Sequence, residues 1–425
     1  MIWHAWIKNT LNFVLCSSLL LPISCGGQTT KEEKFAGINA SHNTLKEPIP
    51  AAHRMDQYLG LLQNKRIALV ANQTSVIART AGASNSEHGN SQRKTYVHLA
   101  DTLKHLGLDV KRVFAPEHGF RGTADAGAFI ENGVDQKTGL KIISLYGKKK
   151  KPSPEDLADL DFLVFDIQDV GARFYTYLST LHYVMEACAE QNIPLLVLDR
   201  PNPNAHYIDG PVLKSAFKSF VGLHPVPIVY GMTLGEFAQM INGELWLTDQ
   251  RQCDLTVIQV DHYTHQTPYI LPIAPSPNLP STQAIALYPS LCLFEGTPIS
   301  AGRGTSQPFE GFGRPGLDPE DYPFKFTPVE RPGAKWPKFK NKICHGLDLS
   351  HIEAPDQIEL GWLKKMLAAS NEPEEFFTPF FDKLAGTDEL RKQLAQGIEA
   401  KTIRASWKQN IESFKRIRAK YLLYP

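Results

Sequence analysis

Cysteine is scarce in this chain, and its spacing argues against two common ways of stabilising a fold. The 425 residues contain six cysteines, of which Cys16 and Cys25 lie in an apolar amino-terminal stretch. The others show neither CxxC pairs nor zinc-ligand spacing: Cys188, Cys253, Cys292 and Cys344. They allow three disulfide pairings, but Cys188 falls on the apolar face of a predicted helix, where a buried thiol is expected. We therefore predict no metal site and no essential disulfide.

An excess of charge of one sign is also lacking. The sequence has 45 Lys and Arg residues against 44 Asp and Glu, a net charge of +1. Such a balance creates no field that would attract nucleic acid or an acidic surface. A hydrophobic content of 42% and a charged content of 21% are typical of a soluble globular protein.

Cofactor and nucleophile signatures are missing as well. No G-x-G-x-x-G motif follows the first predicted strand, which argues against a dinucleotide cofactor. No Ser or Cys stands in a nucleophile elbow that would pair with His118 in a hydrolase triad. The lysine run 148–151 lacks the Gly-rich loop of a phosphate site and suits a solvated turn. We predict no cofactor.

Residues 1–25 form a predicted lipoprotein signal peptide, followed by a polar tether over residues 26–48. The apolar run from Leu11 to Ile23 is too short to span a bilayer. It ends at Ser24-Cys25, a small residue before cysteine as in bacterial lipoprotein signals, although Pro22 replaces the usual aliphatic residue. We expect an exported, periplasmic protein held at a bacterial membrane by a lipid on Cys25, with ordinary secretion as the alternative.

Four short apolar runs lead directly into clusters of polar residues. Such runs are typical of strands buried on both faces of a parallel sheet, and they cover Ile67–Val70, Val110–Ala115, Phe162–Phe165 and Leu195–Leu198. Helical patterns lie between them at Thr95–Leu106 and Thr176–Gln191. This alternation predicts a Rossmann-like, doubly wound α/β sheet. Because ligands bind beyond the carboxyl ends of such strands, the polar clusters are expected to face one crevice.

The composition changes in the second half of the chain. Prolines recur between residues 268 and 289, and glycines between 296 and 316. We place a domain boundary near 268, giving a Rossmann-like domain over 49–268 and a smaller α+β domain over 269–425. Three further elements are expected: a strand at Val226–Tyr230, a helix at Leu234–Gly243 with Thr233 and Glu236 in a capping box, and a helix at Asp388–Tyr421.

The densest polar cluster runs from Pro116 to Arg121. Pro116 and Phe120 flank Glu117 with apolar surface, which favours the protonated form of a carboxyl group. A glutamate at the end of a strand is otherwise most often solvated or a capping residue. With His118 and Arg121 adjacent, Glu117 is a candidate proton donor.

Other polar residues in the strand-end loops have two readings each. Asp166 and Asp169 suit catalysis, but equally a bond to a backbone amide or a helix cap. Arg173, Arg200 and Arg303 lie beside Gly or Pro in such loops, a setting that suits binding of a carboxylate or a sugar as well as an ion pair.

Seven long strings carry a resemblance to a known family. They are ANQTS (71–75), FAPEHGFRG (114–122), LVFDIQDVGARFYTYLSTL (163–181), LDRPNPN (198–204), DGPVL (209–213), SPNLPS (276–281) and EGTPISAGRGTSQPFE (295–310). Together they resemble the NamZ (YbbC-like) exo-β-N-acetylmuramidases, over roughly residues 50 to 425. The resemblance implies hydrolysis of non-reducing-end β-1,4-linked N-acetylmuramic acid in peptidoglycan fragments. It also implies a catalytic Rossmann-like domain, a smaller second domain and an active-site cleft between them.

The resemblance places the family's proposed catalytic glutamate at Glu117. A glycosidase usually needs a second carboxylate, for which Asp166, Asp169 and Glu310 are candidates, and a substrate-assisted route through the 2-acetamido group stays open. Residues expected to bind the saccharide or muropeptide are Asn72, His118, Arg121, Gln168, Arg173, Tyr175, Arg200, Asn202, Arg303 and Glu310. The alternatives are a periplasmic muramyl-sugar binding protein, or an esterase or deacetylase.

Replacement of Cys25 by alanine tests the predicted lipid anchor. Cys25→Ala should leave the precursor without lipid and release the protein from the membrane fraction, because one acyl anchor is its expected attachment. Fractionation and mass spectrometry of the mature amino terminus measure both effects. An unmodified mature terminus in the wild-type protein would contradict the anchor.

Overall fold

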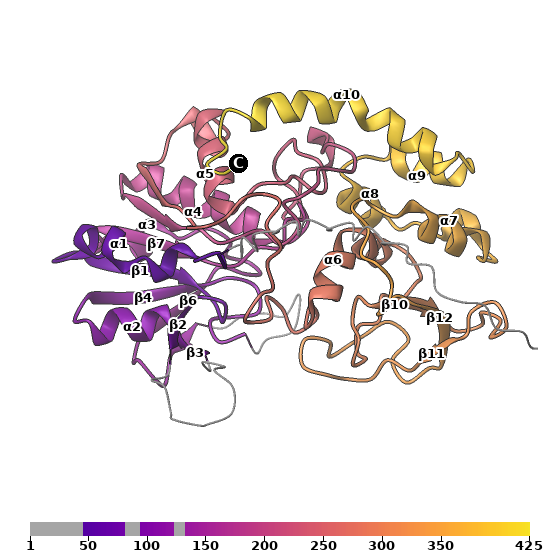
Figure 1. Ribbon diagram of the computed structural model, residues 1–425, viewed down its shortest axis with the longest axis horizontal. Helices are drawn as coiled ribbons and strands as arrows, with labels where there is room; N and C mark the ends of the chain where they lie inside the picture. The colour runs from indigo at the N-terminus through magenta and orange to yellow at the C-terminus, as the bar shows by residue number, and fades with distance from the viewer. Residues whose placement is uncertain (1–45, 81–93, 123–131) are drawn as a thin grey trace, which may run out of the picture. The chain divides into compact units, whose positions relative to one another are not determined.

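A mainly parallel sheet forms the first half of the molecule (Figure 1). The computed structural model describes residues 46–80, 94–122 and 132–425. Among these residues, the largest sheet has seven strands in the order β5-β6-β4-β1-β7-β8-β9, parallel except for the β5–β6 pair. The strands are β1 Arg66–Ala71, β4 Asp109–Ala115, β5 Gly133–Val134, β6 Lys141–Ser144, β7 Phe162–Asp166, β8 Leu195–Leu198 and β9 Leu255–Ile258.

Helices cover both faces of this sheet. Side chains alternate along a strand, so Ile67 and Leu69 of β1 pack in one core with α1 and α2, whereas Ala68 and Val70 pack in another with α4 and α5. These helices are α1 Met55–Leu62, α2 Leu99–His105, α4 Tyr177–Gln191 and α5 Leu234–Gly243, and the short α3 Pro154–Leu157 precedes β7. The predicted Rossmann-like α/β class is confirmed.

The parallel register brings the strand ends to one edge. Ala71 of β1 pairs with Asp166 of β7, and Val70 pairs with Phe114 of β4. The polar clusters that follow β1, β4, β7 and β8 therefore begin at the same edge, where parallel sheets bind ligands.

The second half combines helices with a smaller antiparallel sheet of order β10-β12-β11. Its strands are β10 Gly311–Arg314, β11 Phe324–Phe326 and β12 Cys344–Asp348. The helices are α6 Thr282–Leu291, α7 Leu360–Ala368, α8 Pro379–Ala385, α9 Glu389–Ala395 and α10 Ala400–Arg418. A separate hairpin joins β2 Val76–Thr80 and β3 Lys94–His98. Short 3-10 turns are η1 Ala51–His53, η2 Ser215–Phe217, η3 Thr248–Gln250, η4 Cys292–Gly296 and η5 Pro373–Glu375.

One apolar core continues from the first half into the second. It joins Phe165 and Phe237 with Phe294, Phe312 and Phe381, and residues Lys46–Pro425 form a single compact unit. The domain boundary near residue 268 stays a prediction.

The carboxyl end of the chain lies beside α5 (Figure 1). The backbone N–H of Leu423 donates to Oε1 of Glu236 at 2.8 Å, and the Tyr424 hydroxyl donates to Oδ2 of Asp199 at 2.6 Å. The expected capping box of Thr233 and Glu236 is present at the start of α5. Glu236 therefore serves the helix end and the carboxyl-terminal segment together.

Three predicted elements need correction. The helix expected at Thr95–Leu106 begins only at Leu99, because residues 94–98 pair with β2 as strand β3. Val226–Tyr230 is no ladder strand, since Pro225 and Pro227 lack N–H donors, and only isolated bridges form at Val229. The helix expected over Asp388–Tyr421 is two helices, broken near Gly397, whose φ of 71° lies in the left-handed region.

Some predictions fall outside the described residues. Residues 1–25 with Cys25, and the tether up to residue 45, are among them. In the part of the chain that is described, no helix is both long and apolar enough to cross a membrane. Cys188, Cys253, Cys292 and Cys344 are free and buried.

A buried ion pair ties β7 to the loop after β8. Asp166 and Arg200 have side chains exposed by 1% and 3%, and Arg200 donates through Nε to Oδ1 at 2.6 Å and through Nη2 to Oδ2 at 3.0 Å. Arg200 also donates to the carbonyl of Val76 at 3.2 Å. The pair therefore joins three segments at the carboxyl edge of the sheet.

Replacement of Asp166 and replacement of Arg200 should lower the free energy of unfolding with different pH dependences. Asp166→Asn leaves a buried guanidinium that cannot lose its charge, and should cost about 3–5 kcal/mol at any pH between 5 and 8. Arg200→Met leaves Asp166, whose pKa burial already raises even beside Arg200. Its folded-state pKa then exceeds the unfolded value, so the variant should be more stable at pH 5 than at pH 8 relative to wild type.

Urea unfolding of both variants at the two pH values measures these losses. Equal pH dependence in the two variants, or losses below about 1 kcal/mol, would contradict a buried pair of this kind.

Candidate active site

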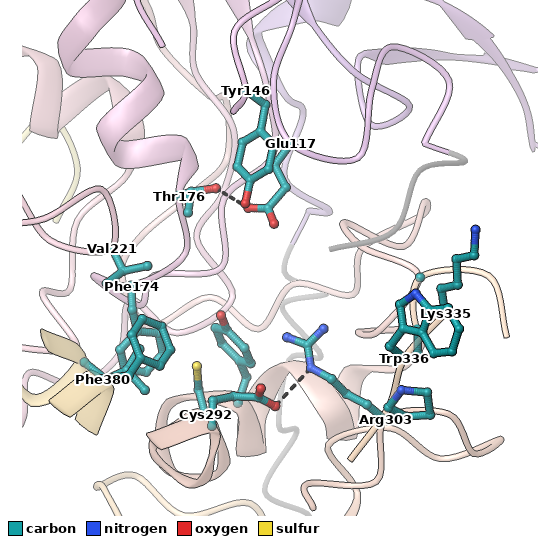
Figure 2. Close-up of a pocket in the computed structure, with 16 residues that line it drawn as sticks. Glu117, Tyr146, Phe174, Thr176, Val221, Cys292, Arg303, Lys335, Trp336 and Phe380 are labelled. Carbon is teal, nitrogen blue, oxygen red and sulfur yellow. Dashed lines mark hydrogen bonds and ion pairs between the residues drawn. The ribbon is translucent and has the colours of Figure 1, made fainter. Parts of the chain in front are cut away.

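A cavity of about 560 Å³ opens beside the carboxyl edge of the large sheet (Figure 2). This volume is in the range of small-molecule sites. The first half of the chain lines it with Glu117, Tyr146, Phe174, Thr176 and Val221, and the second half with Tyr288, Cys292, Glu295, Arg303, Gly333–Pro337, Phe380 and Leu384. A hollow of about 50 Å³ shares Glu117 and Arg303 with it and adds His118 and Tyr175.

Glu117 reaches the cavity from the loop after β4. Pro116 ends the strand, and His118 and Gly119 turn the chain with φ of 69° and 77°, both in the left-handed region. The Gly119 N–H bonds back to the carbonyl of Pro116 at 3.0 Å. This tight turn fixes the half-buried Glu117 at the edge of the sheet.

Two hydroxyl groups hold the Glu117 carboxyl group. The Thr176 hydroxyl, at the start of α4, donates to Oε2 of Glu117 at 2.7 Å (Figure 2). The Tyr146 hydroxyl also bonds to Glu117, and burial, together with this contact to Glu117, raises the pKa of Tyr146. Tyr146 therefore keeps its proton and acts as a donor. The carboxyl group is oriented before any ligand arrives.

Arg303 faces Glu117 from the second half of the chain. Its Nε donates to Oε1 of Glu295 at 3.0 Å, and its guanidinium lies 5.2 Å from the centre of the Phe309 ring. Figure 2 shows both terminal nitrogens pointing into the cavity. Within the described residues, Glu295 is the hydrogen-bonding partner of Arg303, so these two nitrogens are available to a ligand.

Glu295 is an ionised carboxylate. Burial acts to raise its pKa, but Arg303 and Lys338 outweigh burial and hold the pKa below its usual range. Since Glu295 carries its charge next to Arg303, its role in the site is to orient the guanidinium.

Lys338 connects the rim of the cavity, residues 333–337, to the segment 294–299. Its ammonium contacts four backbone carbonyls of residues 294–299, at 2.8 Å for Phe294, 3.3 Å for Glu295, 2.7 Å for Thr297 and 3.1 Å for Ile299. The other end of the rim is held by the Asn278 amide, which donates to the carbonyl of Gly333 at 2.7 Å. Residues 333–337 are therefore anchored at both ends.

The structure brings four of the predicted site residues to the cavity or the hollow that continues it: Glu117, His118, Tyr175 and Arg303. His118 is buried beside Glu117 in the chain. The Tyr175 hydroxyl donates to the carbonyl of Pro275 at 2.9 Å and so ties the start of α4 to the second half.

The three candidate second carboxylates lie elsewhere. Asp166 is committed to Arg200. Asp169 accepts bonds from the Tyr230 hydroxyl and the Gly171 N–H, and burial raises the pKa of Asp169 to about 6. Glu310 accepts a bond from the Ser281 hydroxyl at the start of α6. None of the three is among the described residues that line the cavity.

The other predicted ligand-binding residues hold the fold around the site. Arg173 is 1% exposed and donates to the carbonyls of Pro211, Val226 and Leu384. Arg121 pairs with Asp101 and Asp135.

Three amide side chains are buried and hydrogen-bonded within the protein. Gln168 donates to the carbonyls of Asp169 and Pro201, and Asn202 donates to that of Met232. Asn72 donates to the Tyr177 hydroxyl at 2.8 Å, which itself lies 3.3 Å from the carbonyl oxygen of Glu117. Asn72 thus supports the Glu117 loop through the Tyr177 hydroxyl.

Sequence reasoning missed several residues that line the cavity, among them Tyr146, Thr176, Glu295 and Trp336, and also missed Lys338, which anchors its rim. Thr176 and Glu295 lie within strings already singled out by their resemblance to a family, which was the available signal. Tyr146 and Trp336 had no such signal, because only long-range packing carries them to Glu117 and Arg303.

Comparisons with known proteins agree across the chain. Sequence models described as exo-beta-N-acetylmuramidase NamZ match residues 67–283 (amino-terminal part) and 286–424 (carboxyl-terminal part). The peptidoglycan beta-N-acetylmuramidase NamZ of Bacillus subtilis (strain 168) is 37% identical over 393 residues, 87% of this chain and 89% of that protein.

Two crystal structures of DUF1343 family proteins from Bacteroides fragilis NCTC 9343 are also similar. One is 46% identical with a TM-score of 0.79, and the other is 28% identical with a TM-score of 0.70. Each comparison covers 89% of this chain and 99% of the solved one.

Proposed function

The chain belongs to the exo-beta-N-acetylmuramidase NamZ family, and from this membership and the cavity we propose how it acts. It is a glycoside hydrolase that removes β-1,4-linked N-acetylmuramic acid from the non-reducing ends of peptidoglycan fragments. The observation that carries the proposal is Glu117, oriented by two hydroxyl groups and facing the terminal nitrogens of Arg303 across one cavity.

Glu117 is the proton donor. As the bond between C1 of N-acetylmuramic acid and the bridging oxygen breaks, the proton of Glu117 passes to that oxygen and the leaving sugar departs as an alcohol. Water then supplies the hydroxyl group that ends on C1. The bonds from Thr176 and Tyr146 hold the carboxyl group in position for this transfer.

Arg303 is suited to recognise the lactyl carboxylate of N-acetylmuramic acid. This group distinguishes the substrate from N-acetylglucosamine, and two parallel guanidinium bonds match a carboxylate. Of the four arginines considered from the sequence, Arg121, Arg173 and Arg200 are committed to protein partners. Arg303 alone among them lines the cavity within the described residues.

The nucleophile of the first step is the 2-acetamido group of the substrate itself. Glu295, the second described carboxylate in the cavity, is bound to Arg303. Instead of a protein carboxylate, the acetamido oxygen of the sugar can attack C1 and form a ring. Water then opens this ring. A binding protein without hydrolytic activity has no observation in its favour, because the curated relative is a muramidase.

We also propose export and lipid attachment at Cys25. The support is the apolar run that ends at Ser24-Cys25 and the polar tether after it. A periplasmic location would place the enzyme beside its peptidoglycan substrate.

Glu117→Gln tests the proton donor. The amide keeps the shape of the side chain but carries no transferable proton, so hydrolysis of a muramyl-glucosaminyl disaccharide should fall by about 10² to 10⁴. The loss should shrink on an aryl glycoside, whose leaving oxygen needs little protonation. Reducing-sugar release and melting temperature are the measurements. A folded variant with full activity on the disaccharide would show that Glu117 is not the proton donor.

Arg303→Met tests recognition of the lactyl carboxylate. Loss of a hydrogen-bonded charge contact worth roughly 1.5–3 kcal/mol should lower kcat/KM for terminal N-acetylmuramic acid by about 10- to 100-fold. Turnover of terminal N-acetylglucosamine should change little, so the ratio of kcat/KM between the two substrates should fall by the same factor. Arg303→Lys, which keeps the charge but not the planar fork, is the matched control and should recover part of the ratio. An unchanged ratio in Arg303→Met would argue against the contact.

A further inference from the structure

Trp336 is an exposed tryptophan on the rim of the catalytic cavity. The residue is 78% exposed, more than any other large hydrophobic residue in the described ranges. Single exposed apolar residues are ordinary on protein surfaces. Trp336 differs because it lines the cavity that holds Glu117 and Arg303 (Figure 2).

The indole ring is held in place although solvent surrounds it. The Lys340 ammonium lies 4.4 Å from the centre of the ring, and it also bonds to Oε2 of Glu330 at 2.8 Å and to the carbonyl of Lys335 at 3.3 Å. A cation above an indole face is an attractive contact. The ring therefore has a preferred orientation before a ligand binds.

The backbone beneath Trp336 is also fixed. Asn278 holds Gly333 on one side, and Lys338 joins the other side to the carbonyls of residues 294–299. These carbonyls belong to the segment that carries Glu295, the partner of Arg303. Trp336 thus keeps a defined position relative to the groups that bind the substrate, which lowers the entropy lost on binding.

The chemistry of the ring suits a sugar. An indole offers a flat apolar face, and the C–H groups of a pyranose ring form a matching apolar surface. Saccharide sites commonly pair such a face with a few polar groups, here Glu117 and Arg303.

The exposure of the lining residues indicates which sugar of the substrate would contact Trp336. The Arg303 side chain is 25% exposed and Glu117 is half-buried, so the sugar that they engage lies in the cavity. In an exo-acting hydrolase the rest of the substrate extends outward from the scissile bond. Trp336 is far more exposed than Arg303 or Glu117, so among these three residues it is the one nearest to solvent.

We propose that Trp336 is the stacking surface for the sugar on the reducing-end side of the scissile bond, which is N-acetylglucosamine in a peptidoglycan fragment. This inference rests on the proposed function, since it uses the assignment of the cavity to terminal N-acetylmuramic acid. Trp336 is a binding residue for the leaving group and takes no part in proton transfer.

Two substrates that differ only beyond the scissile bond test the inference. Trp336→Ala should lower kcat/KM for the muramyl-glucosaminyl disaccharide by about 5- to 20-fold, as expected for loss of one aromatic stacking contact. The β-fluoride of N-acetylmuramic acid has no sugar on that side, and its hydrolysis should stay within about twofold of wild type. Trp336→Phe keeps an aromatic face and should recover part of the loss.

Ile270→Ala is the matched control, because Ile270 is 75% exposed and does not line the cavity as described. It should leave both substrates unchanged. Equal losses on the two substrates in Trp336→Ala, or no loss on either, would overturn the inference.

Binding of a sulfur-linked disaccharide separates this inference from the proposed function. If wild-type enzyme released no sugar from the disaccharide, the proposed function would fail. Trp336→Ala should still weaken binding of the sulfur-linked disaccharide and leave binding of N-acetylmuramic acid unchanged, as measured by calorimetry. Unchanged affinity for both ligands would overturn the role of Trp336 by itself.

Discussion

Burial of the parallel strands on both faces is the constraint from which the site follows. A strand such as Leu195–Leu198 has no solvent-exposed face, so all its side chains must be apolar until the chain leaves the sheet. Polar side chains can begin only at the carboxyl edge, and there four neighbouring strands deliver them together. Glu117 occurs at such an exit from β4, held by Thr176 from the start of α4 and by Tyr146 from the loop after β6.

The second half of the molecule supplies the cations and the rim. Arg303 gains its orientation from Glu295, and Lys338 adds a charge that keeps Glu295 ionised. Burial lowers the pKa of Lys338, while Glu295 opposes that shift. The Glu295 carboxylate therefore stabilises both cations, which repel each other, and the carbonyls around Lys338 accept hydrogen bonds from its ammonium. Neither half of the chain builds the cavity by itself.

The sequence was informative where local pattern records burial. Continuous apolar runs predicted the strands, and the break at Pro116 predicted a functional loop at Glu117. Pattern could not separate a ligand-binding arginine from a structural one. Arg173 follows Gly171 in a strand-end loop, yet its guanidinium donates to the carbonyl of Leu384, which lies 211 residues away in sequence. Trp336 lay outside every recognised string, and only the fold carries it to the cavity.

The contacts of Leu423 and Tyr424 bear on how the first half of the chain reaches its full stability. Asp199 and Glu236 belong to the first half, where their carboxyl groups are buried, and part of their hydrogen bonding comes from residues near the carboxyl end. These partners are distant in sequence from the Rossmann-like part that they complete. A buried carboxylate short of donors is costly, so that part reaches full stability only with residues 423 and 424 docked on it. The full stability of the first half therefore depends on Leu423, which lies 187 residues beyond Glu236 in sequence.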